Sequence, residues 1–324
     1  MEIKPYVIGI DIGGQSAKIG VCDTRGNIIA HIKIGSRQTE LSEFVNDLSG
    51  ALKKIIAEVG GRDKIRGIGV GAPNGNYYKN SIEYAPNLEW GKDENGTPTV
   101  IPLGSILKDL TSLPVAITND ANAAAYGEMT YGCAHGLKDF IMLTLGTGVG
   151  SGIVINGEIL YGHDGFAGEL GHTIAVKNGR KCGCGRYGCL ETYASATGVA
   201  RTAKEFLLRD DKPSLLRDYD IEKITSKDIY DCAKKDDKLA IEIFEFTGKI
   251  IGERLADFVA FSAPEAIILF GGLAAAKEFI EKPIYKTMNE NLLVFWKDKI
   301  KLLFSTLPNA DAAILGASSL AWEL

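Results

Sequence analysis

The sequence predicts an α/β protein with two related domains, and three observations support this prediction. An apolar strand, a glycine turn and a hairpin follow one another in the first half of the chain and again in the second half. Each half then carries a further apolar strand that ends at glycine. Stretches with helical spacing of apolar residues separate these strands, which is typical of α/β domains.

The first unit begins with an apolar strand over residues 6–11, which ends at Asp11 and the turn Gly13-Gly14. Alternation along the sequence predicts two more strands, over residues 18–22 and 27–34, with a tight turn between them. The chain of 324 residues is long enough for a second domain of the same kind.

A helix and two strands complete this first unit. Apolar residues at helical spacing predict a helix over residues 41–59, which the pair Gly60-Gly61 ends. An apolar strand over residues 65–70 comes next. A strand over residues 115–118 then ends at Asn119-Asp120, and an alanine-rich helix follows it.

The second unit repeats the order of the first. An apolar strand over residues 140–145 leads into a glycine-rich turn, residues 146–152, and a hairpin over residues 153–160. We expect a long helix over about residues 240–261 and a strand over residues 266–270 that ends at a glycine pair. The glycine turns of the two units would face each other across a cleft.

The composition is that of an ordinary globular protein, with 45% hydrophobic and 24% charged residues. The net charge of −5 argues against a nucleic-acid partner, because domains that bind nucleic acid usually carry a basic stripe. No apolar run approaches the ~20 residues that a membrane span needs. The first residues lack a basic region followed by a long apolar one, so we expect no signal peptide and a cytoplasmic protein.

Three cysteines and one histidine form the densest group of metal-binding side chains: His172, Cys182, Cys184 and Cys189. Three thiolates and an imidazole suit the tetrahedral coordination of a structural zinc. The alternatives are a disulfide framework or unrelated core residues. Short spacings with interleaved glycines and a reducing cytosol favour the metal. The other cysteines lie in apolar segments and are expected to be packed thiols: Cys22, Cys133 and Cys232.

Glycine turns at strand ends let a backbone approach a ligand closely and leave N–H groups for phosphate oxygens. The turn at residues 146–152 opens onto a hairpin, so it is not a dinucleotide-binding fingerprint, and no P-loop sequence is present. Two opposed turns with Asp11 beside the first predict a phosphate clamp with a carboxylate for magnesium. Glycines that only close tight hairpins are the alternative.

Asp120 lies where a strand ends and a helix begins. One interpretation is that it only caps the helix, a position that aspartate favours. The other is a carboxylate that accepts a proton from a hydroxyl group in the cleft. The two interpretations are compatible, and the start of a helix would help to keep the carboxylate ionised.

The chain resembles the ROK family of sugar kinases and sugar-responsive repressors over essentially its whole length, in particular the bacterial glucokinase-like members. The motifs that carry the resemblance are Asp11-Ile-Gly-Gly14, Asn119-Asp120-Ala-Asn-Ala-Ala-Ala, Leu145-Gly-Thr-Gly-Val-Gly150, Glu169-Leu-Gly-His172, Cys182-Gly-Cys184-Gly-Arg-Tyr-Gly-Cys189-Leu-Glu191 and Gly271-Gly272. The resemblance implies an α/β fold of two actin/hexokinase-like (ribonuclease H-like) domains, with ATP in the cleft between them. We expect residues 1–118 to form one domain, to which residues 305–324 return, and residues 119–304 to form the other.

The resemblance also implies an activity, the phosphorylation of a hexose at its 6-hydroxyl by ATP, with glucose as the first choice. By the match of motifs, Asp120 is the catalytic base. The sugar-binding set is Asn87, Asn119, Asp120, Glu169, His172 and Glu191. The residues around the ATP phosphates and Mg²⁺ are Asp11, Gly13, Gly14, Gln15, Lys18, Gly146, Thr147, Gly148, Val149 and Gly150, and Gly271 and Gly272 lie near the adenosine. Zn²⁺ would bind His172, Cys182, Cys184 and Cys189, so His172 takes two roles. A homodimer is expected because the family commonly forms one.

One residue departs from the family pattern. Gln15 follows the first glycine pair where the family usually has threonine, and its amide would donate to phosphate through a longer arm. The preferred sugar is open among glucose, N-acetylhexosamines, mannose and fructose. We expect residues 74–98, with Tyr77, Tyr78 and Trp90, to line or cover the sugar site.

Two further alternatives concern the class of function. A sugar-sensing repressor would need a helix-turn-helix ahead of the kinase-like body, and the first strand begins by about Tyr6. A catalytically silent sugar-binding protein would not need Asp120 together with both glycine turns. We therefore expect an ATP-dependent sugar kinase.

Overall fold

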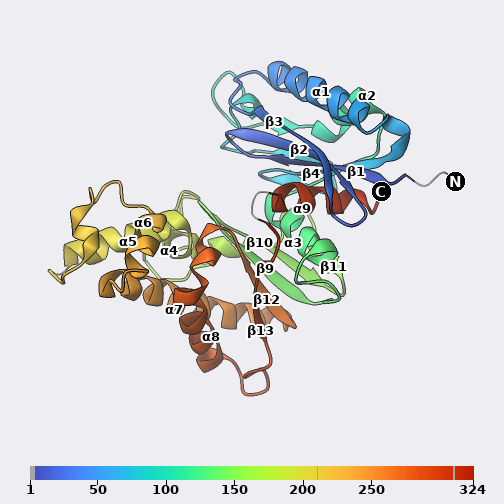
Figure 1. Ribbon diagram of the computed structural model, residues 1–324. Coiled ribbons are helices and arrows are strands. Elements are labelled where there is room, and N and C mark those ends of the chain that lie inside the picture. The colour runs from blue at the N-terminus through green and yellow to red at the C-terminus, as the bar shows by residue number, and fades with distance from the viewer. Residues whose placement is uncertain (1–3, 210, 309–310) are drawn as a thin grey trace. The chain divides into compact units, whose positions relative to one another are not determined.

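The computed structural model describes residues 4–209, 211–308 and 311–324 (Figure 1). It divides the chain into two compact units. Unit 1 comprises Met1–Gly136, Ile159–Gly168 and Thr306–Leu324, and unit 2 comprises Leu137–Glu158 and Glu169–Ser305. The expected domain ranges also include residues 1–3, 210 and 309–310, which lie outside the described residues.

The division differs from the expected domain boundaries in two segments and at Ser305, which was expected in the first domain and belongs to unit 2. Residues 119–136 and 159–168 were expected in the second domain, and both belong to unit 1. The first segment carries α3 (Asp120–Tyr131), which packs against the C-terminal helix α9 (Ala312–Ala321). A contact between segments so distant in the chain leaves no mark in the local pattern that the sequence boundaries were based on.

The sheet of unit 1 has five strands in the order β3-β2-β1-β4-β8. β1 is antiparallel to β2 and parallel to β4, and β4 is parallel to β8. Each of the five strands was predicted from the sequence within a few residues. Their bounds are β1 Tyr6–Ile12, β2 Ser16–Asp23, β3 Ile28–Gly35, β4 Ile65–Gly71 and β8 Val115–Thr118.

Helices cover both faces of this sheet. On one face α1 (Leu41–Glu58) packs through buried residues such as Phe44, and α9 lies on the opposite face (Figure 1). The α9 face has glycines in register: Gly9 on β1 lies opposite Gly20 on β2 and Gly69 on β4. A Cβ on Gly69 would come within 1.9 Å of a backbone oxygen of α9, so the helix sits directly on the sheet.

Small elements complete unit 1. A three-stranded sheet, β5-β6-β7, was not predicted, because strands of two or three residues carry no alternation to recognise. The remaining elements of unit 1 are β5 Gly75–Asn76, β6 Ser81–Glu83, β7 Val100–Ile101, α2 Leu103–Thr111 and the 3-10 helices η1 Arg62–Lys64 and η2 Glu89–Gly91.

The sheet of unit 2 has the order β11-β10-β9-β12-β13. Its bounds are β9 Phe140–Leu145, β10 Val149–Ile155, β11 Glu158–Ile159, β12 Ala266–Phe270 and β13 Lys301–Phe304. The glycine-rich turn is shorter than the predicted 146–152. Gly150, Ser151 and Gly152 pair with β9 inside β10, because alternate glycines still form ladder hydrogen bonds.

The helices of unit 2 lie between the sheet strands in sequence, with α4 to α7 between β11 and β12 and α8 between β12 and β13. The predicted long helix is α7 (Lys238–Ser262), which packs against α8 (Lys277–Asn291). The other helices of unit 2 are α4 Glu191–Ala194, α5 Ala196–Arg209, α6 Ser226–Ala233 and the 3-10 helices η3 Leu170–His172, η4 Leu215–Asp218 and η5 Gly272–Ala276. Within the described ranges, no helix is both long enough and apolar enough to span a membrane.

Candidate active site

Three parallel strands of unit 1 bring two carboxylates to one edge of the sheet. Asp11 of β1 pairs with Gly71 of β4, and Gly71 pairs with Thr118 at the end of β8. Asp120 comes two residues after Thr118, at the start of α3. The charge of Asp120 contributes to the raised pKa of Asp11, so the two carboxylates interact. Residues far apart in the sequence thus form one acidic pair.

Desolvation by the surrounding protein shifts the pKa of both carboxylates. It raises the pKa of Asp11 to about 6, although Lys18, directly opposite on β2, lowers it. Desolvation by the surrounding protein also raises the pKa of Asp120, although this residue is exposed to solvent. The backbone N–H of Ala121 donates to Asp120 Oδ1 at 2.9 Å and favours the ionised form, as a helix start was expected to do. The loss of solvation outweighs it.

Asn119, and not Asp120, caps helix α3. The Asn119 Oδ1 atom accepts a hydrogen bond from the backbone N–H of Asn122 at 2.6 Å. The interpretation of Asp120 as a simple N-cap is therefore wrong. The cap holds Asn119 in place, and Asp120 occupies the first turn of the helix.

The first glycine loop has two N–H groups that it does not use internally. The N–H of Gly13 donates to Ser16 O at 3.0 Å and closes the turn. Within the described part of the chain, no acceptor is paired with the N–H groups of Gly14 and Gln15. Gly14 is also a point of close approach, since a Cβ there would lie 2.7 Å from Asn87 O. The expected phosphate loop and Asn87 are therefore neighbours.

The second glycine loop likewise leaves two N–H groups for a ligand. Three N–H groups are used inside unit 2: Gly146 donates to Gly148 O, Val149 to Glu191 Oε2 and Gly150 to Thr144 Oγ1. Those of Thr147 and Gly148 have no acceptor among the described residues. A loop that binds phosphate through its backbone would use these two groups.

The glycine pair after β12 lies beside this loop. Gly271 has a φ of +103°, and a Cβ there would be 2.7 Å from Leu145 O at the end of β9. Only glycine combines this φ with so close an approach. Gly272 begins η5, and a Cβ there would meet no atom within 4 Å. The pair therefore has an open side next to the turn at Gly146.

Three residues of the expected sugar set lie around the start of β10. η3 packs so closely on this strand that a Cβ on Gly171 would lie 2.0 Å from Val149 O. Glu169 precedes η3, and His172 ends it. Glu191, the first residue of α4, accepts the Val149 N–H at 3.0 Å. The strand thus brings both glutamates and the histidine into one region of unit 2.

The four proposed zinc ligands converge in the structure. One ligand atom from each of His172, Cys182, Cys184 and Cys189 lies within 4.8 Å of all the others. Cys184 Sγ is 3.6 Å from Cys189 Sγ, and His172 Nδ1 is 3.7 Å from Cys182 Sγ. Zn–S bonds of about 2.3 Å place two sulfurs about 3.8 Å apart at tetrahedral angles, whereas a disulfide needs about 2.0 Å. The donor set and its spacing fit one tetrahedral zinc ion.

The surroundings of the cluster favour ionised sulfur at one position. Cys184 is exposed; some desolvation opposes its ionisation, but hydrogen bonds from Arg186 and the neighbouring thiols lower its pKa to about 6. The Arg186 side chain also donates to His172 O at 2.7 Å. Since His172 turns Nδ1 toward the sulfurs, its Nε2 is left for another partner.

The comparisons with known proteins agree with these motifs. The model of the ROK family matches residues 7–323. The chain belongs to the ROK family. It is 35% identical to a glucokinase of Halalkalibacterium halodurans over 96% of this chain and 93% of that protein. It is 30% identical to a xylose repressor of Caldicellulosiruptor bescii over 96% of this chain and 76% of that protein.

A solved ROK structure shares the fold of this chain. The ROK family glucokinase from Streptomyces griseus, in complex with glucose and AMPPNP, is 32% identical, with a TM-score of 0.79 over 98% of this chain and 100% of that chain. This likeness confirms the expected α/β, actin/hexokinase-like fold.

One expectation for this ROK chain needs correction. Residues 74–98, which include Trp90, were expected to line or cover the sugar site, but Trp90 is 2% exposed and stacks on Phe44 with ring centroids 4.2 Å apart. Tyr77 stacks on Tyr161, also at 4.2 Å. Of the three aromatic side chains, Tyr78 is the one that is mostly exposed. The rings of Trp90 and Tyr77 pack against other aromatic rings, because burial of a large ring stabilises the fold.

Sequence reasoning missed two connections in this ROK chain. It did not predict the hydrogen bond between Val149 and Glu191, which joins a glycine loop to a sugar-site candidate. It also missed Arg180, whose buried side chain bonds to the helices after the cysteine loop. An arginine next to a cysteine motif carries no local signal of burial.

Proposed function

We propose that the protein is an ATP-dependent sugar kinase that transfers the γ-phosphoryl group of ATP to the 6-hydroxyl of a hexose, with glucose preferred. The observation that carries the proposal is the pair Asp11 and Asp120 at one edge of the unit 1 sheet, where the charge of Asp120 contributes to the raised pKa of Asp11. A carboxylate for the metal–nucleotide and a base for the hydroxyl are the two acidic groups that this reaction needs. The 35% sequence identity with a glucokinase supports glucose as the preferred substrate.

Asp120 is the proposed general base. A carboxylate with a raised pKa is a stronger base than an unperturbed one, so Asp120, which is exposed to solvent, takes the 6-hydroxyl proton more readily near neutral pH. A positioned base of this kind contributes roughly 10²–10⁴-fold to the rate. Asn119, fixed by its cap to Asn122, would donate its side-chain N–H groups to a neighbouring sugar hydroxyl.

The glycine loops are the proposed phosphate-binding elements. Unit 1 offers the N–H groups of Gly14 and Gln15 and the cation of Lys18, and unit 2 offers the N–H groups of Thr147 and Gly148. Asp11 would hold Mg²⁺, which when bound offsets the charge of the phosphates. Phosphoryl transfer depends chiefly on such positioning and electrostatics.

Sugar recognition is assigned to polar groups that can each bond to hydroxyls. Glu169 and Glu191 accept, and His172 Nε2 and the Asn87 amide complete the set. When bound, zinc would stabilise the cysteine loop from which α4 and Glu191 follow. It would be held by the His172 imidazole and the three thiolates.

The proposal also covers the localisation, the oligomeric state and the binding partners of the protein. We propose a cytoplasmic homodimer that uses small-molecule sugar and ATP and binds no nucleic acid. Light scattering after size exclusion would give the mass, and a protomer mass alone would contradict the dimer.

A sugar-sensing regulator is the second candidate, because the chain is also similar to a xylose repressor. Kinases for N-acetylhexosamines, mannose or fructose are further alternatives. An ADP-release assay over a panel of hexoses and 2-acetamido sugars tests them together. We expect the highest kcat/KM with glucose. ADP release with none of the sugars, together with a sugar-dependent gel shift of DNA, would favour the regulator.

A further inference from the structure

Arg180 connects the cysteine loop, residues 180–189, to the two helices that follow it. It lies two positions before Cys182, and its side chain is only 5% exposed. Among the described residues it is the only arginine or lysine classed as buried. A buried guanidinium is stable only when its N–H groups are bonded, so the position of such a residue is tightly fixed.

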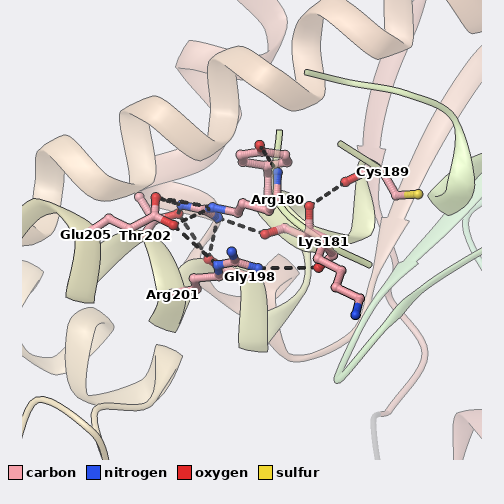
Figure 2. A network of polar contacts seen from close by, with 9 residues as sticks. Arg180, Lys181, Cys189, Gly198, Arg201, Thr202 and Glu205 are labelled. Atoms are coloured by element: carbon pink, nitrogen blue, oxygen red, sulfur yellow. Dashed lines mark hydrogen bonds and ion pairs between the residues drawn. The ribbon is translucent and has the colours of Figure 1, made fainter. Parts of the chain in front are cut away.

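The Arg180 side chain satisfies all of its N–H groups on α4 and α5 (Figure 2). Nε donates to both Glu205 oxygens at 3.0 and 3.2 Å, and Nη2 donates to Glu205 Oε2 at 2.5 Å and Thr202 Oγ1 at 2.9 Å. Nη1 donates to the backbone oxygens of Thr192 at 2.7 Å and Gly198 at 3.1 Å. The last two bonds hold together the end of α4 and the start of α5, residues 191–198, which we call the α4–α5 corner.

The backbone of Arg180 belongs to the cysteine loop. Its carbonyl accepts the N–H of Gly188 at 2.7 Å, next to the ligand Cys189. Its own N–H donates to Tyr193 Oη at 3.0 Å, and the guanidinium lies 4.3 Å from the centre of the Tyr193 ring. One residue therefore ties the metal loop to the α4–α5 corner, independently of the four ligand atoms.

The α4–α5 corner in turn contacts the second glycine loop. The N–H of Ala196 donates to Gly146 O at 2.8 Å, and Thr197 Oγ1 donates to Thr147 O at 3.1 Å. The same corner begins with Glu191, whose carboxylate accepts the Val149 N–H. The position of this corner therefore affects both the proposed phosphate loop and a proposed sugar ligand.

We propose that Arg180 is a positioning residue for both substrates: it fixes the α4–α5 corner and thereby sets Glu191 and the Gly146–Gly148 turn. The proposal rests on the proposed kinase function. A positioning role can be distinguished from a role in stability alone. If Arg180 served only stability, its substitution would reduce the amount of folded protein, which lowers the apparent kcat and leaves KM unchanged. Displacement of the corner raises KM for sugar and for ATP.

Arg180→Met tests the proposal, with Arg209→Met as the matched control. Arg209 makes the same kinds of contact farther along α5: an ion pair with Glu242 at 3.1 Å and a guanidinium 4.1 Å from the Phe206 ring centre. We expect Arg180→Met to raise both KM values and to lower kcat/KM by roughly 10–100-fold, as loss of groups around metal ligands does. Arg209→Met should keep wild-type KM values.

Two measurements without turnover separate this proposal from the kinase proposal. Calorimetric titration should show weaker binding of AMPPNP to Arg180→Met, and a colorimetric chelator should remove zinc from it faster at unchanged initial zinc content. A wild-type protein that phosphorylates no sugar would contradict the kinase proposal. The AMPPNP affinity and the rate of zinc removal could still be compared between the wild type and Arg180→Met, and they would still test the role of Arg180.

Wild-type KM values and AMPPNP affinity in Arg180→Met would overturn the positioning role. If this variant does not fold, Arg180→Lys decides. Lysine keeps a charge near Glu205 but lacks the planar fork that reaches Thr192 and Gly198 together. We expect the same rise in both KM values for Arg180→Lys, and unchanged values would equally overturn the proposal.

Discussion

The Oε2 atom of Glu191 accepts a hydrogen bond from the backbone N–H of Val149 at 3.0 Å. The contact joins a proposed sugar ligand to the proposed phosphate loop within unit 2. It depends on a neighbouring glycine, because a Cβ on Gly148 would lie 2.6 Å from the same oxygen.

We expect Gly148→Ala to impair substrate binding more than stability. The new methyl group meets the end of the Glu191 side chain, which moves more easily than backbone, so the carboxylate would leave Val149. KM for the sugar should rise by about tenfold, which corresponds to roughly 1.4 kcal/mol. Steady-state kinetics and a thermal melt check this.

Gly183→Ala is the control for this substitution, since a Cβ there would meet no atom within 4 Å. Its KM should equal that of the wild type. A Gly148→Ala protein with wild-type KM would mean that the position of Glu191 does not matter for the sugar.

Asp120→Asn should lower kcat by roughly 10²–10⁴-fold, because the amide cannot accept the hydroxyl proton. The sugar KM should change much less, since the amide still forms hydrogen bonds. In the wild type, the raised pKa of Asp120 predicts that kcat falls on the acid side as the carboxylate becomes protonated. Near-wild-type turnover by Asp120→Asn would exclude Asp120 as the base.

Asp11→Asn should stabilise the protein above about pH 6 while it impairs use of Mg–ATP. Burial raises the pKa of Asp11 from 3.8 to about 6, so the folded state disfavours the ionised carboxylate. Removing this ionisation should raise the free energy of unfolding by at most about 3 kcal/mol.

The upward direction of the Asp11 pKa shift determines the pH range in which Asp11→Asn changes the free energy of unfolding. A raised pKa means that the stability contributed by the wild-type carboxyl is complete below about pH 4 and is lost as the pH rises through about 6. The gain from Asp11→Asn should therefore be absent near pH 4 and largest at neutral pH. Urea unfolding at several pH values measures it, and a gain that grows toward acid pH would contradict the assignment.

Removal of zinc should abolish activity before it unfolds the chain. The four proposed ligands lie in unit 2, in η3 and the cysteine loop, while the core of unit 1 contains none of them. Dialysis against a chelator should leave the far-ultraviolet circular dichroism nearly unchanged and remove sugar phosphorylation. Zinc re-addition should restore it.

Cys184→Ser should reproduce the zinc-free protein, and Cys232→Ala should not, because Cys232 lies on α6 outside the cluster. Elemental analysis gives the zinc content of both. Full activity in a preparation free of zinc would refute the scaffold role.

The sequence predicted the longer elements well, for a physical reason. Strands such as β1 and β9 alternate or run apolar over several residues, and α7 keeps helical spacing over 25 residues, so local patterns define them. The strands β5 to β7 are too short for any pattern. The place of α3 beside α9 depends on contacts between distant segments, which local periodicity cannot reveal.

In the candidate site, too, features set by local sequence could be predicted, and features set by contacts between distant residues could not. The convergence of His172 with the three cysteines could be predicted, because coordination chemistry restricts both residue type and spacing. The cap at Asn119 could have been predicted as easily as one at Asp120, since both residue types cap helices. The bonds of Arg180 could not, because an exposed and a buried arginine look alike in sequence.

The glycines beneath α9 have a consequence for how the chain is made. Gly9, Gly20 and Gly69 belong to the early strands of unit 1, yet the helix that covers them follows the whole of unit 2 in the chain. The first sheet would therefore leave the ribosome with one face uncovered until residues 312–321 have been made. Most of unit 2 lies between these segments and could fold first, which reverses the usual N-terminal-first order.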